Sequence, residues 1–82
     1  MASMRVWLAQ VTGLKQLDTG VTDIKNYASL ISAVSREIAE THLLRAYAIQ
    51  YPGYVIASTP VLSDETNDIR AWVKNNPEEP TQ

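Results

Sequence analysis

The chain has 82 residues, of which 45% are hydrophobic and 20% charged, with a formal net charge of −2 and no cysteine. This length and composition predict one small folded domain, and they exclude disulfides and thiolate-bound zinc. No apolar run is long enough to cross a bilayer, and the first residues do not resemble a signal peptide. We therefore expect a cytoplasmic protein that is not bound to a membrane, in a bacterium or in an infected host cell.

The charge is unevenly distributed along the chain. Residues 1–50 hold five basic and four acidic side chains, whereas residues 51–82 hold two basic and five acidic ones. Binding to nucleic-acid phosphates depends on clustered Lys and Arg side chains. The charge balance therefore argues against broad affinity for nucleic acid.

The first half of the chain predicts a strand, a loop and a long helix. Residues 5–12 are rich in β-branched and aromatic side chains and stop at Gly13, which favours a strand. Residues 13–22 contain Gly, Asp and Thr and are typical of a loop. Over residues 23–41 the apolar spacing becomes helical, and Thr22 or Asp23 is the expected N-cap. The predicted buried stripe of this helix is Ile24, Tyr27, Ile31, Val34 and Ile38.

The second half predicts a hairpin and a short helix. Residues 44–51 and 54–58 alternate like strands around the turn signal Pro52–Gly53. The competing interpretation extends the first helix to Gln50 and ends it at Pro52. Ser63 is the expected N-cap of a last helix that ends at residues 75–77. The expected buried face of that helix consists of Ile69, Trp72 and Val73.

Together these elements predict an α+β domain with the order β-α-β-β-α. We expect two layers, with both helices on one face of a three-stranded sheet and a parallel crossover through the first helix. The alternative is a mostly helical protein with one long central helix. The domain is expected to span residues 1–76, followed by a flexible tail over residues 77–82.

The sequence offers no recognisable catalytic centre. His42 is the only histidine, and it lacks a partner of the kind that a catalytic triad or a transition-metal site requires. Asp64 and Asp68 are four residues apart beside Glu65, a spacing that could form an acid–base pair but is also typical of a solvated first helical turn. We therefore expect no enzymatic activity, no metal and no cofactor.

Residues 35–50 allow a second interpretation as a degenerate helix-turn-helix. Ile38, Ala39, Leu44 and Ile49 lie near the expected core positions, but Leu43 stands where the turn prefers glycine. In this alternative, or if a sheet platform stacks bases, Arg36 and Arg45 would contact the nucleic acid.

Two helices cannot cover both faces of a three-stranded sheet, so aromatic side chains should remain on the open face. Tyr and Trp are favoured at interfaces because they bury a large area and keep a polar group. We therefore expect a small non-enzymatic protein-interaction module, such as a regulator, inhibitor or assembly factor, that binds a protein partner or forms a homodimer. The predicted interface residues are Trp7, Tyr47, Ile49, Tyr51 and Tyr54.

Overall fold

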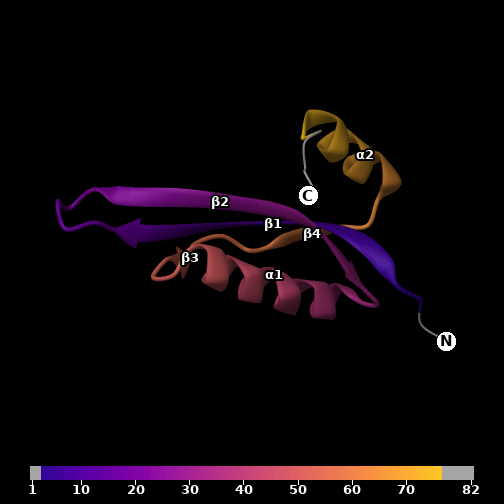
Figure 1. Cartoon of the computed structure of the whole chain (residues 1–82), viewed down its shortest axis with the longest axis horizontal. Helices are drawn as coiled ribbons and strands as arrows, with labels where there is room; N and C mark the ends of the chain where they lie inside the picture. Colours follow the sequence, from indigo (N-terminus) through magenta and orange to yellow (C-terminus); the bar gives the residue numbers. More distant parts are fainter. Residues whose placement is uncertain (1–2, 77–82) are drawn as a thin grey trace.

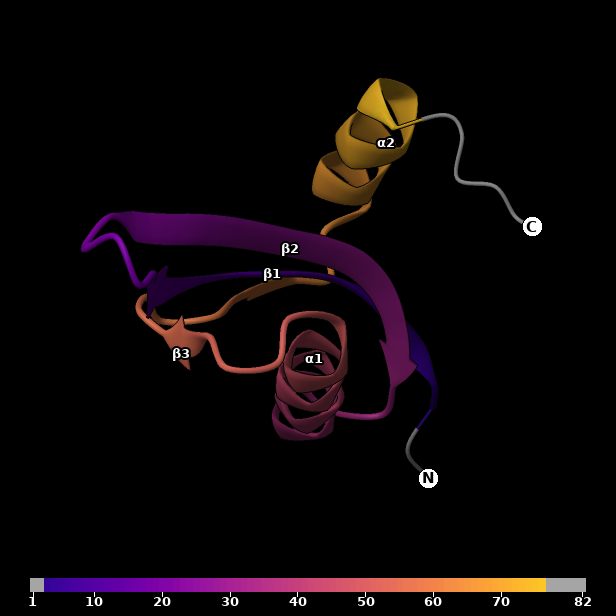
Figure 2. The ribbon, with the colours of Figure 1, turned by 60° about the vertical axis from the view of Figure 1, so that its left-hand side comes forward.

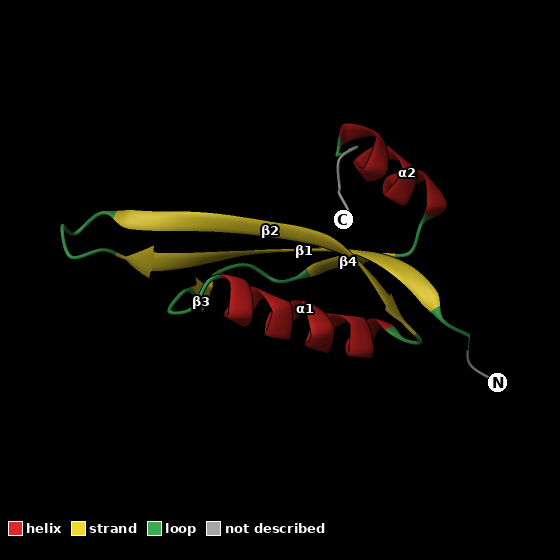
Figure 3. Ribbon diagram, in the orientation of Figure 1, coloured by secondary structure: helices red, strands yellow, loops and turns green. Residues whose placement is uncertain are grey.

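The computed structural model describes residues 3–76 and has the element order β-β-α-β-β-α (Figures 1 and 3). The α+β class is confirmed, and the mostly helical alternative is wrong. The predicted order is also wrong, because a second strand stands where the first helix was expected. The predicted tail over residues 77–82 lies outside the described residues. The elements are β1 (Arg5–Gln16), β2 (Thr22–Ala33), α1 (Arg36–Gln50), β3 (Val55–Ile56), β4 (Val61–Ser63) and α2 (Thr66–Asn75).

A long antiparallel hairpin forms the centre of the fold. β1 and β2 pair over their whole length, from Arg5 opposite Ala33 to Gln16 opposite Thr22. The turn between them is closed by a 2.8 Å hydrogen bond from the Leu17 N–H to the Val21 carbonyl, and Gly20 adopts the positive φ of 89° that an L side chain would disfavour. Residues 13–16 and 22–33 are therefore strand, where a loop and a helix were expected.

Helix α1 begins directly after Ser35, which is its N-cap. The Ser35 hydroxyl accepts a 3.2 Å hydrogen bond from the Ile38 N–H, and the helix ends at Gln50 before Pro52. The alternative helix end at Gln50 is thus confirmed. The hairpin predicted over residues 44–58 is wrong in its first half, whereas β3 lies within its second half.

The third strand of the sheet is interrupted. β3 and β4 both pair antiparallel with β1, on the side away from β2. Residues 57–60 separate them, and Pro60 cannot donate a ladder hydrogen bond. Every strand pair among residues 3–76 is antiparallel, so the predicted parallel crossover is absent there.

The two helices lie on opposite faces of the sheet (Figure 2), not on one face as predicted. α1 packs on β1 and β2, while α2 contacts β1 from the other side. Ser63 is not the N-cap of α2, which is Glu65. Instead its hydroxyl accepts from the Glu65 N–H and donates to Asp68 at 2.7 Å.

The core lies almost entirely between α1 and the sheet. Only eight hydrophobic residues are buried among residues 3–76, and all except Leu8 belong to two clusters on the α1 side. Neither helix of this part of the chain is both long and apolar enough to cross a membrane. The buried residues are Trp7, Leu8, Ala9, Val11, Ala33, Ala39, Leu43 and Tyr47.

Candidate interaction surface

The side of the hairpin opposite α1 forms a broad surface that we call the open face. Odd-numbered residues of β1 and β2 point toward α1, so the even-numbered ones point away from it. By their pairing with Gln10 and Leu14, Val61 and Val55 of the third strand lie on the same side. The open face of the hairpin consists of Val6, Leu8, Gln10, Thr12, Leu14, Gln16, Thr22, Ile24, Asn26, Ala28, Leu30 and Ser32.

The open face of the hairpin carries no ionisable side chain, although one residue in five of the chain is charged. All four charged residues of β1 and β2 occupy odd positions: Arg5, Lys15, Asp23 and Lys25. Exposed aliphatic side chains are present at both ends of the face, with Ile24 57% exposed. Depletion of charge distinguishes the centre of protein interfaces from ordinary protein surface.

Helix α2 covers one end of the open face. It begins three residues after Ser63, the cross-strand neighbour of Leu8, which is the only buried even-numbered residue of β1. Ile69 and Trp72 are half-buried and Val73 is exposed, and none of residues 66–75 is buried. α2 therefore has an apolar side that the rest of the described chain covers only partly.

Two of the predicted interface residues belong to the core and not to an open face. Trp7 is buried, and its indole N–H donates a 3.1 Å hydrogen bond to the Ala33 carbonyl. Tyr47 is buried because it lies on α1, on the side that faces the sheet, and not on a strand. The predicted placement of both side chains is wrong for the same reason: α1 covers the odd side of the hairpin.

All four tyrosines of the chain form one row beneath the hairpin. Ring centroids are 6.3 Å apart for Tyr27 and Tyr47, 5.2 Å for Tyr47 and Tyr51, and 5.7 Å for Tyr51 and Tyr54. These spacings are those of favourable aromatic pairs. Tyr51 and Tyr54, both predicted interface residues, are half-buried in this row. The row therefore joins the end of α1 to the hairpin and does not form an open aromatic surface.

The hydroxyl groups of Tyr47 and Tyr54 are fixed by hydrogen bonds to the hairpin. Tyr47 donates to the Lys25 carbonyl at 3.0 Å, and Tyr54 donates to the Asp23 carboxylate. Burial is the main cause that raises the pKa of Tyr47. The hydrogen bond to Asp23, with burial second, raises the pKa of Tyr54 to about 12. Both groups therefore stay protonated at neutral pH.

Gly13 makes the packing of Tyr47 against β1 possible. A Cβ atom at this position would overlap the Tyr47 hydroxyl oxygen and would lie 2.7 Å from Cζ. The glycine therefore marks a strand position under an aromatic ring, and not the end of a strand. The sequence signal that could have revealed this was a glycine within a continuing β-like pattern, Val11 to Leu14.

The remaining predicted contact residues lie on the outer side of α1. Ile49 is 77% exposed, Arg45 is exposed, and Arg36 forms a 3.5 Å ion pair with Glu40. α1 continues without a turn through Leu43, so these residues do not form a helix-turn-helix. The even positions of β1 and β2 hold no aromatic side chain, and the open face of the hairpin is therefore not a base-stacking platform.

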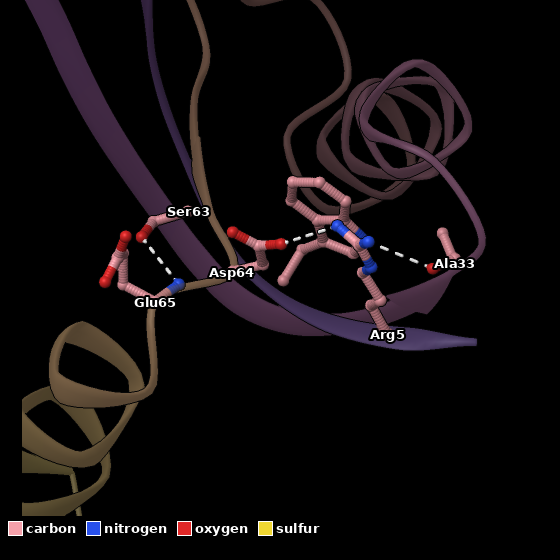
Figure 4. Close-up of polar contacts among 6 residues, drawn as sticks. Arg5, Ala33, Ser63, Asp64 and Glu65 are labelled. Carbon is pink, nitrogen blue, oxygen red and sulfur yellow. Dashed lines mark hydrogen bonds and ion pairs between the residues drawn. The ribbon is translucent and has the colours of Figure 1, made fainter. Parts of the chain in front are cut away.

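The residues considered for chemistry do not come together. Asp64 forms a 2.9 Å ion pair with Arg5, while the Ser63 hydroxyl accepts from the Glu65 N–H (Figure 4). His42 is exposed on α1, which lies on the face of the sheet opposite α2 and its Asp68. Within residues 3–76 there is no group of three His, Asp or Glu side chains placed to hold a metal ion, and no pocket.

Comparison with known protein families, with curated proteins and with solved structures gave no match to this chain.

Proposed function

We propose that this protein is a non-enzymatic interaction module that binds a protein partner through the open face and the adjoining apolar side of α2. The observation that carries the proposal is the absence of ionisable side chains over both strands of the hairpin on that side. Along a strand with one solvated side, apolar residues that face the core normally alternate with charged and polar residues that face water. Here the polar positions are filled by Gln, Asn, Ser and Thr, which can donate and accept hydrogen bonds and cost less to desolvate than a charged group.

The dimensions of the face support the same conclusion. Twelve residues of strand extend about 40 Å, and the two strands of the hairpin are about 10 Å wide, so the hairpin part of the face covers about 400 Å². A standard interface uses about 800 Å² from each partner. The short strands β3 and β4 and the apolar side of α2, with Trp72 and Val73, enlarge the surface toward that area.

A regulator, inhibitor or assembly factor acts through such a surface without chemistry of its own. Binding would cover the exposed aliphatic residues Val6, Ile24, Leu30 and Val61. Nucleic-acid binding is the weaker candidate, because the described chain provides neither a helix-turn-helix nor aromatic residues on the open face of the hairpin.

Site-specific photocrosslinking in the cells of origin tests the proposal. A benzophenone amino acid is placed at Val61, on the open face, and at Ile49, on the outer side of α1, as the matched exposed control. We expect a discrete crosslinked protein from position 61 and none from position 49. The absence of a discrete product at position 61, or the same product from both positions, would contradict the proposal.

A further inference from the structure

The two edges of the sheet differ in how they are protected. One edge consists of β3 and β4, which have two and three residues and are separated by residues 57–60, including Pro60. Short strands and prolines of this kind prevent an edge from pairing with another chain. The other edge is β2, which has twelve residues in continuous register and contains neither Gly nor Pro. Among residues 3–76, β2 pairs with β1 alone.

The hydrogen bonds of Thr12 reveal which backbone groups of β2 are directed to its free edge. The Thr12 N–H donates to the Ser58 hydroxyl at 3.2 Å, and its carbonyl accepts from the Ala57 N–H at 2.9 Å, so Thr12 points toward the third strand. The next residue, Gly13, therefore points toward β2, and its partner Lys25 points back toward β1. By alternation, the N–H and C=O groups directed to the free edge belong to Thr22, Ile24, Asn26, Ala28, Leu30 and Ser32. One of them, the Leu30 carbonyl, also accepts a 3.4 Å hydrogen bond from the Ser29 hydroxyl.

We propose that β2 pairs antiparallel with β2 of a second copy of this chain, across a two-fold axis at Tyr27. A two-fold axis perpendicular to the sheet keeps both α1 helices on the same side, so even residues meet even residues. With Tyr27 on the axis, residues 22–32 of both copies overlap. The edge-directed residues then pair as Thr22 with Ser32, Ile24 with Leu30 and Asn26 with Ala28, each pair occurring twice.

The side chains of β2 favour this register. Ile24 and Leu30, both exposed in the single chain, would lie opposite each other in two symmetric pairs. No charged residue of one copy lies opposite a charged residue of the other, since Lys25 faces Ser29 and Asp23 faces Ile31. With the axis at Ala28 instead, Ile24 would face Ser32 and both aliphatic pairs would be lost. The sequence of β2 is thus complementary to itself in this register, so we expect a second copy of the chain to pair with this edge.

This inference goes beyond the proposed function because it rests on the free backbone edge of β2, although the side chains that it pairs, such as Ile24 and Leu30, also belong to the open face. The dimer would join two charge-free faces into one continuous surface, with the α1 helices together on the opposite side. Val61, where partner binding is tested, lies on β4, and β1 separates β4 from the dimer contact at β2. Failure of the dimer therefore leaves the photocrosslinking test unaffected, and failure of that test leaves the dimer unaffected.

Two double variants that differ only at residue 28 test the register. Asn26→Lys with Ala28→Lys places like charges opposite each other twice, whereas Asn26→Lys with Ala28→Glu places opposite charges there. Both positions are exposed in the single chain, so neither pair of substitutions fills the core. Light scattering coupled to size-exclusion chromatography should give twice the 9.1 kDa mass for the wild type and the Lys/Glu variant. The dissociation constant of the Lys/Lys dimer should be at least about tenfold higher, because like charges directly opposite each other destabilise strand pairing.

Every other outcome overturns the inference. A wild type that is monomeric at high concentration would contradict the dimer. If both double variants are dimeric, the contact through the β2 edge is wrong. If both are monomeric, the proposed register is wrong. Ala28→Pro provides an independent check, because it deletes an N–H that points to the free edge and leaves the β1 ladder intact. This variant should be folded by circular dichroism and monomeric by light scattering, and a dimeric Ala28→Pro protein would also contradict the edge contact.

Discussion

Helix α1 and helix α2 use their apolar residues in opposite ways. α1 buries Ala39, Leu43 and Tyr47 against the hairpin, although exposed Ile38 and Ile49 make its apolar stripe imperfect. α2 has a well-defined apolar side, yet it buries no residue within the described chain. An amphipathic pattern therefore shows which side of a helix avoids water, but not whether its own chain supplies the cover.

The largest effect should come from removing a core side chain of α1. Leu43 is completely buried, so Leu43→Ala should lower the free energy of unfolding by about 2–5 kcal/mol. Trp72→Ala on α2 removes a larger side chain, but it should lower the free energy of unfolding by no more than about 1 kcal/mol, because Trp72 is only half-buried. Urea unfolding measures both. Equal losses would mean that α2 belongs to the core, and the contrast between the helices would fail.

Adding atoms to the two sides of the hairpin should give a similar contrast. Gly13→Ala places a methyl group into the Tyr47 ring and should destabilise the fold by about 1–3 kcal/mol. Ala28→Val adds a larger group to the exposed open face and should change stability by about 0.5 kcal/mol or less. Thermal or urea unfolding of the two variants provides the measurement. A neutral Gly13→Ala variant would show that Tyr47 does not pack as described.

The stability of the α1 side should also depend on alkaline pH, whereas contacts of the open face should not. The pKa of Tyr54 is raised from 10.0 to about 12, so the folded state holds its proton where the unfolded state has lost it. This contribution to stability is complete below pH about 10 and is lost as the pH rises to about 12. Urea unfolding across this range should show the loss, and Tyr54→Phe should reduce it. An unchanged pH profile in Tyr54→Phe would contradict the role of the Asp23 hydrogen bond.

The smallest effect should arise from the ion pair between the start of β1 and the segment before α2. Arg5 and Asp64 are 2.9 Å apart but are 61% and 38% exposed. Arg5→Ala should therefore cost about 0–1 kcal/mol, and the difference should shrink in high salt. A loss above about 2 kcal/mol would show that α2 is anchored more firmly than its exposed residues indicate.

The parts of the fold that could be predicted from sequence are those with a local cause. The β-branched and aromatic residues predict β1 as far as Thr12, the apolar spacing predicts α2, and Pro52 predicts the end of α1 in the alternative interpretation. The spacing of Ile24, Tyr27 and Ile31 predicts a helix where the structure has β2. In the structure Ile24 lies on the open face while Tyr27 and Ile31 lie beneath the sheet, since pairing with β1 outweighs local spacing.

The candidate surface was predicted only in outline. An apolar excess on a sheet follows from the number of strands and helices, but the identity of the exposed residues depends on which side α1 covers. The sequence predicts a helix in place of β2, so Ile24 and Leu30 are expected on a helix and not on the open face. It also predicts a strand over residues 44–51, so Tyr47 is expected on the surface of a sheet and not on the buried side of α1. The side that a covering helix occupies decides which alternate residues of a strand are exposed.

The central position of β1 has a consequence for how the chain folds. β1 pairs with all three other strands and contacts both helices. Its pairing with β2 closes a loop of only five residues, whereas β3 and β4 must return from some forty or more residues away. Since short loops cost less entropy to close, the hairpin can form while the rest of the chain is still unfolded. During synthesis residues 5–33 would then present the template on which α1 and the third strand assemble.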